Sequence, residues 1–373
     1  MPYVFLSHQS ACEVLRRRGT NGSRWPDEGR LLPIWGDCVA GQRQMAALEK
    51  DVDLASLGVV SRPVDILVPT SGYRTRGRRA RTHVWSGAVP TGSMIRVHSR
   101  VLVSGPEFTL LQLSHVHNMH WPQYEAVVDR YWEEREMLER YGYEGKAVME
   151  KPLLWEPVRS LVGIVRLAME FAGTYRLGAT TEEEATYGQP SLMTIESAAT
   201  FAEGVNRHRA SGQMLRALDL ALPNSWSPRE TDLALMLTLP VELGGYGLAR
   251  PQLNVMLDAP SAWHDLMGER KITPDMLWEN ERLVVEYDGH RSHRDAGASK
   301  TDRDIMRANT LRAMGYTVLE VTYGTVETLA RMDSLAGQVA ACLRSSLPKA
   351  DGDALMVRRH LFDELFALNI AEK

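Results

Sequence analysis

The sequence predicts a multidomain α/β fold, and three observations support this expectation. A chain of 373 residues exceeds the length at which one hydrophobic core usually suffices. With 44% hydrophobic and 24% charged residues, the composition is typical of a folded protein and not of a disordered one. The hydrophobic pattern changes along the chain, which predicts an α/β segment (1–117), a helical connector (118–222), a second α/β segment (223–345) and a final amphipathic helix (346–373).

The composition also indicates the cellular compartment. No stretch of about 18 apolar residues occurs, so no membrane span is expected. The N-terminus lacks the basic and then apolar order of a secretion signal. Cys12, Cys38 and Cys342 lie far apart and lack metal-ligand spacing. A reducing cytoplasm fits these features best.

The first segment begins with a pattern typical of a strand followed by a helix, over residues 4–18. Ser10 is the expected N-cap of this helix, and the three arginines that follow suit a helix C-terminus. Short β-rich runs separated by Pro and Gly follow at residues 64–69, 82–86, 93–99 and 100–105.

An arginine-rich loop lies between the first two of these runs. Five of eight consecutive positions are arginine: Arg74, Arg76, Arg78, Arg79 and Arg81. One interpretation is a solvated loop, and the other is a loop that binds nucleic-acid phosphates. The net charge of −4 means that attraction to nucleic acid would have to come from local patches of this kind.

From residue 118 the apolar residues recur at helical spacing. Four helices are expected over residues 124–142, 156–173, 194–207 and 212–222. Aromatic and methionine side chains in such stripes are usually core residues, and we assign this segment no chemistry.

The third segment has the pattern of a compact α/β unit. A helix is expected to begin at Ser227 or Pro228, and a strand follows the glycine-rich turn. Two strands joined by a polar turn at residues 279–281 come next. A helix that ends at Gly315 and a strand over residues 316–322 complete the unit. An amphipathic helix over residues 354–368 closes the chain.

Acidic side chains in this third segment predict a metal centre. Asp275 lies near the start of one strand and Glu286 near the end of the next, so a hairpin would bring both carboxylates to one end of the sheet. Two hard oxygen ligands of this kind hold Mg²⁺ or Mn²⁺ in enzymes that cleave phosphodiesters. Asp288 shares a strand face with Glu286, and three converging acids would repel one another without a cation.

Two histidines follow these acids in a loop. The spacing of His290 and His293 would suit zinc, but no third nitrogen or sulfur ligand is in register. A histidine that positions water or protonates the leaving group is the favoured alternative.

A combination of motifs in the third segment resembles a known family. Pro274 and Asp275 precede VVEYDGHRSH at residues 284–293, and a helix follows with Asp304, Arg307, Leu311 and Gly315. This pattern, over residues 223–325, resembles the PD-(D/E)XK nuclease superfamily. The nearest branch combines very-short-patch-repair-like endonucleases with a bacterial domain of unknown function.

The resemblance implies a restriction-endonuclease-like fold with a mixed central sheet and a Mg²⁺-dependent endonuclease that cuts DNA in defence or repair. Asp275 and Glu286 match the family's two metal-binding acids, and the carbonyl of Tyr287 would be a further ligand. His293 falls where the repair branch has a histidine, whereas His290 has no counterpart. Glu230 resembles an acid of the first helix that supports the metal site.

Asp288 departs from the family pattern because a lysine is usual there. An aspartate at this position could instead bind a second metal ion. The domain either cleaves with such a changed arrangement or has lost cleavage altogether and binds nucleic acid or a toxin partner. Three other positions also keep two interpretations. Glu230 either closes a capping box with Ser227 or supports the metal. Asp304 and Arg307 form either a surface ion pair or contacts to the site or a phosphate.

The first segment has a resemblance of its own. Residues 63–69 and 83–113 resemble the non-DNA-reading domain of abortive-infection type antitoxins. This implies a toxin as a possible partner and a regulatory function as a further alternative. Cutting both strands of DNA with one centre per chain would favour a homodimer.

Overall fold

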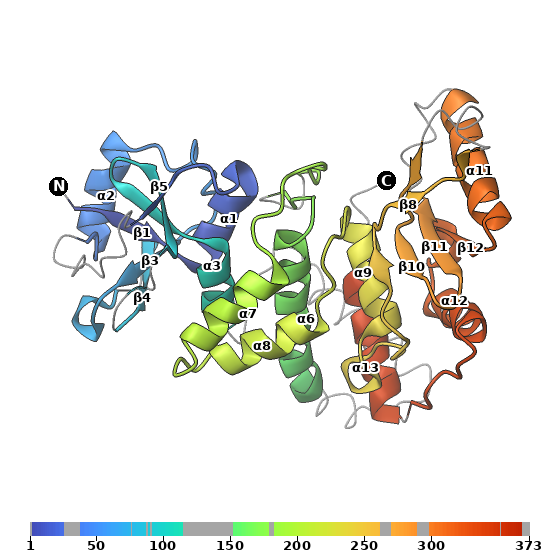
Figure 1. Ribbon diagram of the computed structural model, residues 1–373. Helices are drawn as coiled ribbons and strands as arrows, with labels where there is room; N and C mark the ends of the chain where they lie inside the picture. Colours follow the sequence, from blue (N-terminus) through green and yellow to red (C-terminus); the bar gives the residue numbers. More distant parts are fainter. Residues whose placement is uncertain are drawn as a thin grey trace. The chain divides into compact units, whose positions relative to one another are not determined.

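We describe the protein from a computed structural model (Figure 1). It describes residues 2–25, 38–75, 77–86, 89, 92–114, 152–178, 183–261, 270–288, 298–350 and 352–367. For residues 24–25, 152–157, 298–304 and 367 only the backbone is described. The expected helix over residues 124–142 therefore lies outside the described residues.

The chain divides into two compact units. Within the described residues, unit 1 takes its parts from Met1–Tyr124 and Arg159–Ala221, and unit 2 takes its parts from Glu125–Val158 and Leu222–Lys373. Residues 159–221 are thus part of the first compact unit and do not form a segment of their own.

Unit 1 is built on a six-stranded sheet with the order β2-β5-β6-β1-β3-β4. Its strands are β1 (Val4–Leu6), β2 (Ser23–Trp25), β3 (Val64–Val68), β4 (Ala80–Val84), β5 (Met94–His98) and β6 (Val101–Ser104). β1 pairs in parallel with β6 and antiparallel with β3, and β3 pairs in parallel with β4. The four predicted β-rich runs correspond to β3, β4, β5 and β6.

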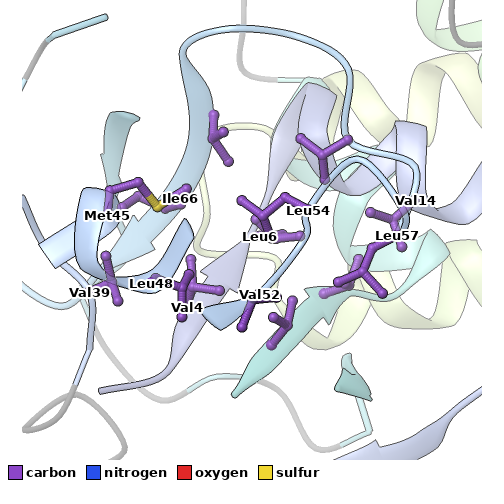
Figure 2. Close-up of a cluster of buried hydrophobic side chains, with 14 of the residues drawn as sticks. Val4, Leu6, Val14, Val39, Met45, Leu48, Val52, Leu54, Leu57 and Ile66 are labelled. Carbon is purple, nitrogen blue, oxygen red and sulfur yellow. The ribbon is translucent and has the colours of Figure 1, made fainter. Parts of the chain in front are cut away.

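The main core of unit 1 lies against one face of this sheet. Alternate residues of three strands contribute to it, such as Val4 and Leu6 of β1, because successive side chains of a strand point to opposite faces. The helices α1 (His8–Arg18) and α2 (Gln42–Asp51) add apolar side chains, among them Val14, Met45 and Leu48 (Figure 2). Helix α2 and strand β2 were not expected from the sequence.

The start of α1 differs from the prediction. The N-cap is Ser7, and its side chain makes no capping hydrogen bond. Ser10 lies inside the helix, where its Oγ accepts a hydrogen bond of 2.9 Å from the backbone N–H of Asp65. The prediction of Ser10 as the cap was wrong because this hydroxyl serves a contact between helix and sheet, which local sequence does not reveal.

Three helices of the middle segment lie in unit 1 together with α3 (Pro106–Leu113), although the first of them does so only from Arg159 onward. They are α6 (Pro152–Phe171), α7 (Ile195–Gly204) and α8 (Ser211–Leu220), and they confirm three of the predicted helices. A buried ion pair joins α6 to α1, with Arg16 Nη2 at 2.7 Å from Glu170 Oε2. Ser197 of α7 donates to Glu107 of α3 over 3.1 Å. These contacts explain why the helices do not form a separate connector.

Unit 2 contains a mixed four-stranded sheet with the order β12-β11-β10-β7. The strands are β7 (Gln252–Leu253), β10 (Met276–Trp278), β11 (Leu283–Asp288) and β12 (Thr317–Thr322), and β8 (Leu257–Asp258) forms a separate pair with β9 (Lys271–Ile272). β10 and β11 form the predicted antiparallel hairpin around residues 279–282. β11 and β12 are parallel, as a crossover through a helix requires.

Both faces of the β10–β11 hairpin are buried, and in Figure 1 the two strands lie between α9 (Pro228–Thr238) and α11 (Ala298–Ala313). Leu311 of α11 packs against Leu277 and Val284. The other face of the hairpin, with Met276 and Val285, is also buried. α9 begins at Pro228 after the N-cap Ser227, and Gly315 follows the end of α11 with φ of 88°, both as predicted.

Two further helices complete unit 2. α12 (Leu329–Cys342) follows β12, and α13 (Gly352–Phe362) continues into a π-helical turn, η7 (Asp363–Ala367). Arg358 of α13 donates to the carbonyls of Gly244 and Gly245, which follow the short 3₁₀ helix η3 (Val241–Leu243). The chain is therefore a mixed α/β protein. Among the described residues, no helix is both long and apolar enough to cross a membrane.

Candidate carboxylate centre in unit 2

Asp275 and Glu286 meet at one end of the β10–β11 hairpin. Met276 pairs with Val285, and extending this register by one residue places Asp275 opposite Glu286. Asp275 Oδ2 accepts a hydrogen bond of 2.6 Å from the backbone N–H of Tyr287. The hairpin thus brings together the two carboxylates that the sequence singled out.

Glu230 joins these two acids from the first turn of α9, and its side chain is buried. Ser227 Oγ accepts from the Glu230 backbone N–H over 3.1 Å, which is one half of the expected capping box. The carboxylate does not complete the box by the usual bond. Its Oε2 instead accepts from the backbone N–H of Trp226 over 3.0 Å and from Asn254 Nδ2 over 2.8 Å.

Arg307 of α11 contributes the positive charge of the cluster. Its Nη2 donates to both carboxylate oxygens of Glu286, over 3.1 Å to Oε1 and 2.9 Å to Oε2. The same nitrogen donates to the carbonyl of Thr273. Arg307 lies one helical turn before Leu311, whose packing on the sheet directs this face of α11 toward the acids. Arg307 thus contacts Glu286, and its predicted pairing with Asp304 involves a side chain outside the described part of the chain.

Burial and mutual repulsion change the acidity of all three carboxyl groups. Burial, followed by the charges of Glu230 and Glu286, raises the pKa of Asp275 well above its usual range. Burial also raises the pKa of Glu230, although hydrogen bonds from Asn254 and Trp226 oppose this. For Glu286, burial raises the pKa even against the opposing charge of Arg307. Burial and the neighbouring acids therefore destabilise the charged forms of these three carboxyl groups.

The charges of this cluster fit a divalent cation. When ionised, the carboxylates of Glu230, Asp275 and Glu286 leave two negative charges after Arg307 balances one. Carboxylate oxygens are the donors that Mg²⁺ and Mn²⁺ prefer. Among the side chains that the structure describes, no three Asp, Glu, His or Cys groups form a ready-made metal site. The fit therefore rests on donor chemistry and charge.

Two asparagines of this region were not identified from the sequence. Asn254, directly after β7, bonds Glu230, and Asn224, in the loop before α9, donates through Nδ2 to the carbonyls of Leu253 and Asn254 over 3.0 Å each. Both have left-handed backbone conformations, with φ of 66° at Asn224 and 50° at Asn254. Asparagine tolerates this conformation better than most residues, which is the one local signal that a sequence could offer.

Three other predicted site residues lie in β11 and α11. Asp288 is the last residue of β11 and pairs in register with Thr322 of β12. Tyr287 contributes its backbone N–H to Asp275. Asp304 belongs to α11, but its side chain is outside the described part of the chain, and so are His290 and His293. The roles of these residues, like those of Asp288 and Tyr287 at a metal, stay predictions.

The arginine loop belongs to unit 1. Arg79 forms an ion pair of 2.7 Å with Glu49 of α2, and Arg81 donates to both oxygens of Asp65 over 2.6 and 3.0 Å. Arg74 and Arg78 are exposed. Arg76 lies outside the described residues. Two of the arginines thus hold acidic partners within unit 1, and the exposed pair presents its charge to solvent.

A second polar cluster surrounds Asp65 on β3. His83 Nε2 lies 2.7 Å from Asp65 Oδ1, and the ring of His83 stacks on that of His8 at a centroid distance of 3.6 Å. Burial opposes ionisation of Asp65, but hydrogen bonds from His83 and Arg81 lower its pKa below the usual value. The sequence offered no sign of this cluster because its members come from three separate elements.

Comparison of the chain with protein-family models, with curated proteins and with solved structures finds no match. The geometry of the carboxylate centre and the sequence motifs are therefore the basis for a functional proposal.

Proposed function

We propose that unit 2 is a metal-dependent nuclease that hydrolyses phosphodiester bonds of DNA, in defence or repair. The observation that carries this proposal is the cluster of Glu230, Asp275 and Glu286, in which three carboxylates share a single guanidinium. Burying several like charges in this way costs folding free energy unless a cation balances them. The resemblance of residues 223–325 to PD-(D/E)XK nucleases supports the choice of reaction.

The residues have separable roles under this proposal. Asp275 and Glu286 hold Mg²⁺ or Mn²⁺, and Glu230 supports them from α9. When bound, the cation stabilises negative charge on the phosphate and activates water. The backbone of Tyr287 fixes the orientation of Asp275. Arg307 holds Glu286 and compensates part of the negative charge, a task that the family assigns to the lysine that Asp288 replaces here.

A second candidate function is a module of the same fold that binds nucleic acid or a toxin without cutting. Asp288 favours it, because an acid cannot supply the positive charge that a lysine gives to the attacking water. An Asp288→Lys variant separates the two functions. If the protein is a nuclease, Asp288→Lys should retain some cleavage. If the protein is a binding module, the variant should show no cleavage.

The decisive experiment is cleavage of supercoiled plasmid by the full chain with Mg²⁺ or Mn²⁺. Wild type should convert the plasmid to nicked and linear forms, and Asp275→Asn and Glu286→Gln should show no cleavage above background. Glu279→Gln is the matched control, because Glu279 is an exposed acid at the opposite end of the same hairpin. Equal cleavage by wild type and both site variants would disprove the site assignment.

Binding of plasmid without cleavage, under conditions in which Mn²⁺ is bound, would support the second candidate instead. Gel-shift measurements on the same samples supply this comparison.

A further inference from the structure

The side chain of Asn254 has one buried polar atom without a partner. Asn254 is 3% exposed, and its Oδ1 makes no hydrogen bond among the described residues. Buried polar atoms in native proteins almost always have a partner, so such an exception points to a group that binds there.

The orientation of this amide follows from its neighbours. Asn254 Nδ2 donates to the carbonyl of Asn224 over 2.9 Å and to Glu230 Oε2 over 2.8 Å. Both partners are acceptors only. Reversing the amide would place its oxygen against two other oxygens, so the unpartnered atom is the carbonyl oxygen and not the nitrogen.

Asn254 also lies between two acids of the carboxylate centre. Its side chain holds Glu230, and its backbone N–H donates to the carbonyl of Asp275 over 3.1 Å. The oxygen and nitrogen of one amide are separated by about 2.3 Å by covalent geometry. Oδ1 therefore lies within about 5 Å of Glu230 Oε2, given the bond of 2.8 Å between Nδ2 and that oxygen.

We infer that Asn254 completes the cation centre, with its Nδ2 positioning Glu230 and its Oδ1 serving as a neutral oxygen donor to the divalent cation. This inference rests on the proposed function of unit 2. Amide oxygens are ligands that hard cations accept beside carboxylates. A neutral donor adds a ligand without adding to the negative charge of Glu230 and Asp275.

The test is Mn²⁺ binding by the full chain, measured by calorimetry, together with thermal unfolding in the absence of metal. Asn254→Gly removes the side chain while keeping a residue that tolerates the φ of 50°. It should weaken Mn²⁺ binding at least about tenfold. Asn254→Asp keeps an oxygen at Oδ1 but loses the donor to Glu230. It should bind Mn²⁺ within about threefold of wild type or more tightly, while lowering the metal-free unfolding temperature through repulsion.

Wild-type affinity in Asn254→Gly would overturn the inference. Equal weakening of Mn²⁺ binding in Asn254→Gly and Asn254→Asp would also overturn the role of Oδ1 as a metal ligand. The two variants share only the loss of Nδ2, so the effect would then come from that atom. Asn280→Gly, at an exposed position in the β10–β11 turn, should bind Mn²⁺ as wild type does.

Asp275→Asn distinguishes this inference from the proposed function. If Asp275→Asn loses Mn²⁺ and Asn254→Gly does not, the inference fails and the metal centre stands. If wild type and Asp275→Asn show the same lack of binding, the metal centre and the role of Asn254 fail together.

Discussion

Under the proposed function, the carboxylate of Asp275 opposes folding and holds the cation. It lies at the centre of the cluster, with burial and the charges of Glu230 and Glu286 raising its pKa. Its hydrogen bond from Tyr287 compensates only part of this. Residues with this combination of burial and like-charged neighbours are concentrated at functional sites, because binding or catalysis gives a benefit that stability alone does not.

A stability measurement tests this view of Asp275. Asp275→Asn keeps an oxygen that can accept from Tyr287 but removes the charge, so repulsion with Glu230 and Glu286 disappears. At neutral pH with chelator present, the variant should be more stable than wild type, by roughly 3 °C in unfolding temperature for each kcal/mol gained. Saturating Mn²⁺ should reverse the order, because only wild type gains from binding.

Thermal scans with chelator and with Mn²⁺ provide the comparison. Asp258→Asn, at an exposed position of β8, should match wild type in both conditions. A variant of Asp275 that is less stable than wild type in chelator would show that this acid stabilises the fold.

At the scale of elements, the strands β3 and β4 are joined by charge as well as by backbone hydrogen bonds. Asp65 and Arg81 are partners in register on these two strands, and His83 lies two residues further along β4. The carboxylate of Asp65 is fully buried, whereas the Arg81 side chain is 41% exposed. Solvent therefore weakens the contribution of the arginine, and the buried acid is the sensitive member of the cluster.

This cluster predicts a pH dependence in unit 1. The folded-state pKa of Asp65 is lowered, so its stabilisation is complete above the unfolded pKa of about 4 and is lost as pH falls through the folded value. Asp65→Asn should lower the free energy of unfolding by about 2 kcal/mol at pH 7. The difference in free energy of unfolding between Asp65→Asn and wild type should become smaller below about pH 4.

Urea unfolding between about pH 3 and pH 7 measures this difference. Asp51→Asn is the control, because Asp51 is 61% exposed and pairs with Arg100 at the surface. A constant difference between Asp65→Asn and wild type over the whole range would contradict the ionisation argument.

The loop before β4 leads to a prediction about nucleic-acid binding. Arg79 and Arg81 hold acids of unit 1, so the exposed Arg74 and Arg78 are the side chains to test. If they contact phosphates, replacing both with serine should reduce the slope of log affinity against log salt by about two. Fluorescence anisotropy with a labelled duplex at several salt concentrations measures the slope. Arg331→Ser, at an exposed pair with Glu327, should leave it unchanged.

The hairpin and its acids were predictable because their information is local. Apolar residues flank a polar turn between Asp275 and Glu286, and strand periodicity then sets the register. The partnership of Glu230 with Asn254 was not predictable, because it joins residues 24 positions apart through tertiary packing. The cap at Ser7 was missed for a similar reason, since the competing Ser10 bonds to a strand that follows much later. Sequence patterns defined the elements, and contacts between elements determined which polar groups meet.

At the scale of the whole molecule, one carboxylate centre is present per chain among the described residues. Under the proposed nuclease function, a single centre would cut one strand at a time, so cleavage of both strands favours two copies. Linear product should then rise more steeply than in proportion to protein concentration. Mixing wild type with excess Asp275→Asn should shift the plasmid product from linear to nicked. Unchanged product ratios, with a monomer in light scattering, would exclude a dimeric enzyme.

The contact of α13 with the glycine turn affects the order in which unit 2 is completed during translation. Arg358 bonds the carbonyl of Gly245 across 113 residues of sequence. At ordinary elongation rates, the ribosome adds this length on the order of 10 s after it makes the turn. Arg229, beside Glu230 on α9, likewise donates to the carbonyl of Leu365. A nascent chain that stops before residue 352 therefore lacks both contacts, the one to the glycine turn and the one to the helix that bears Glu230.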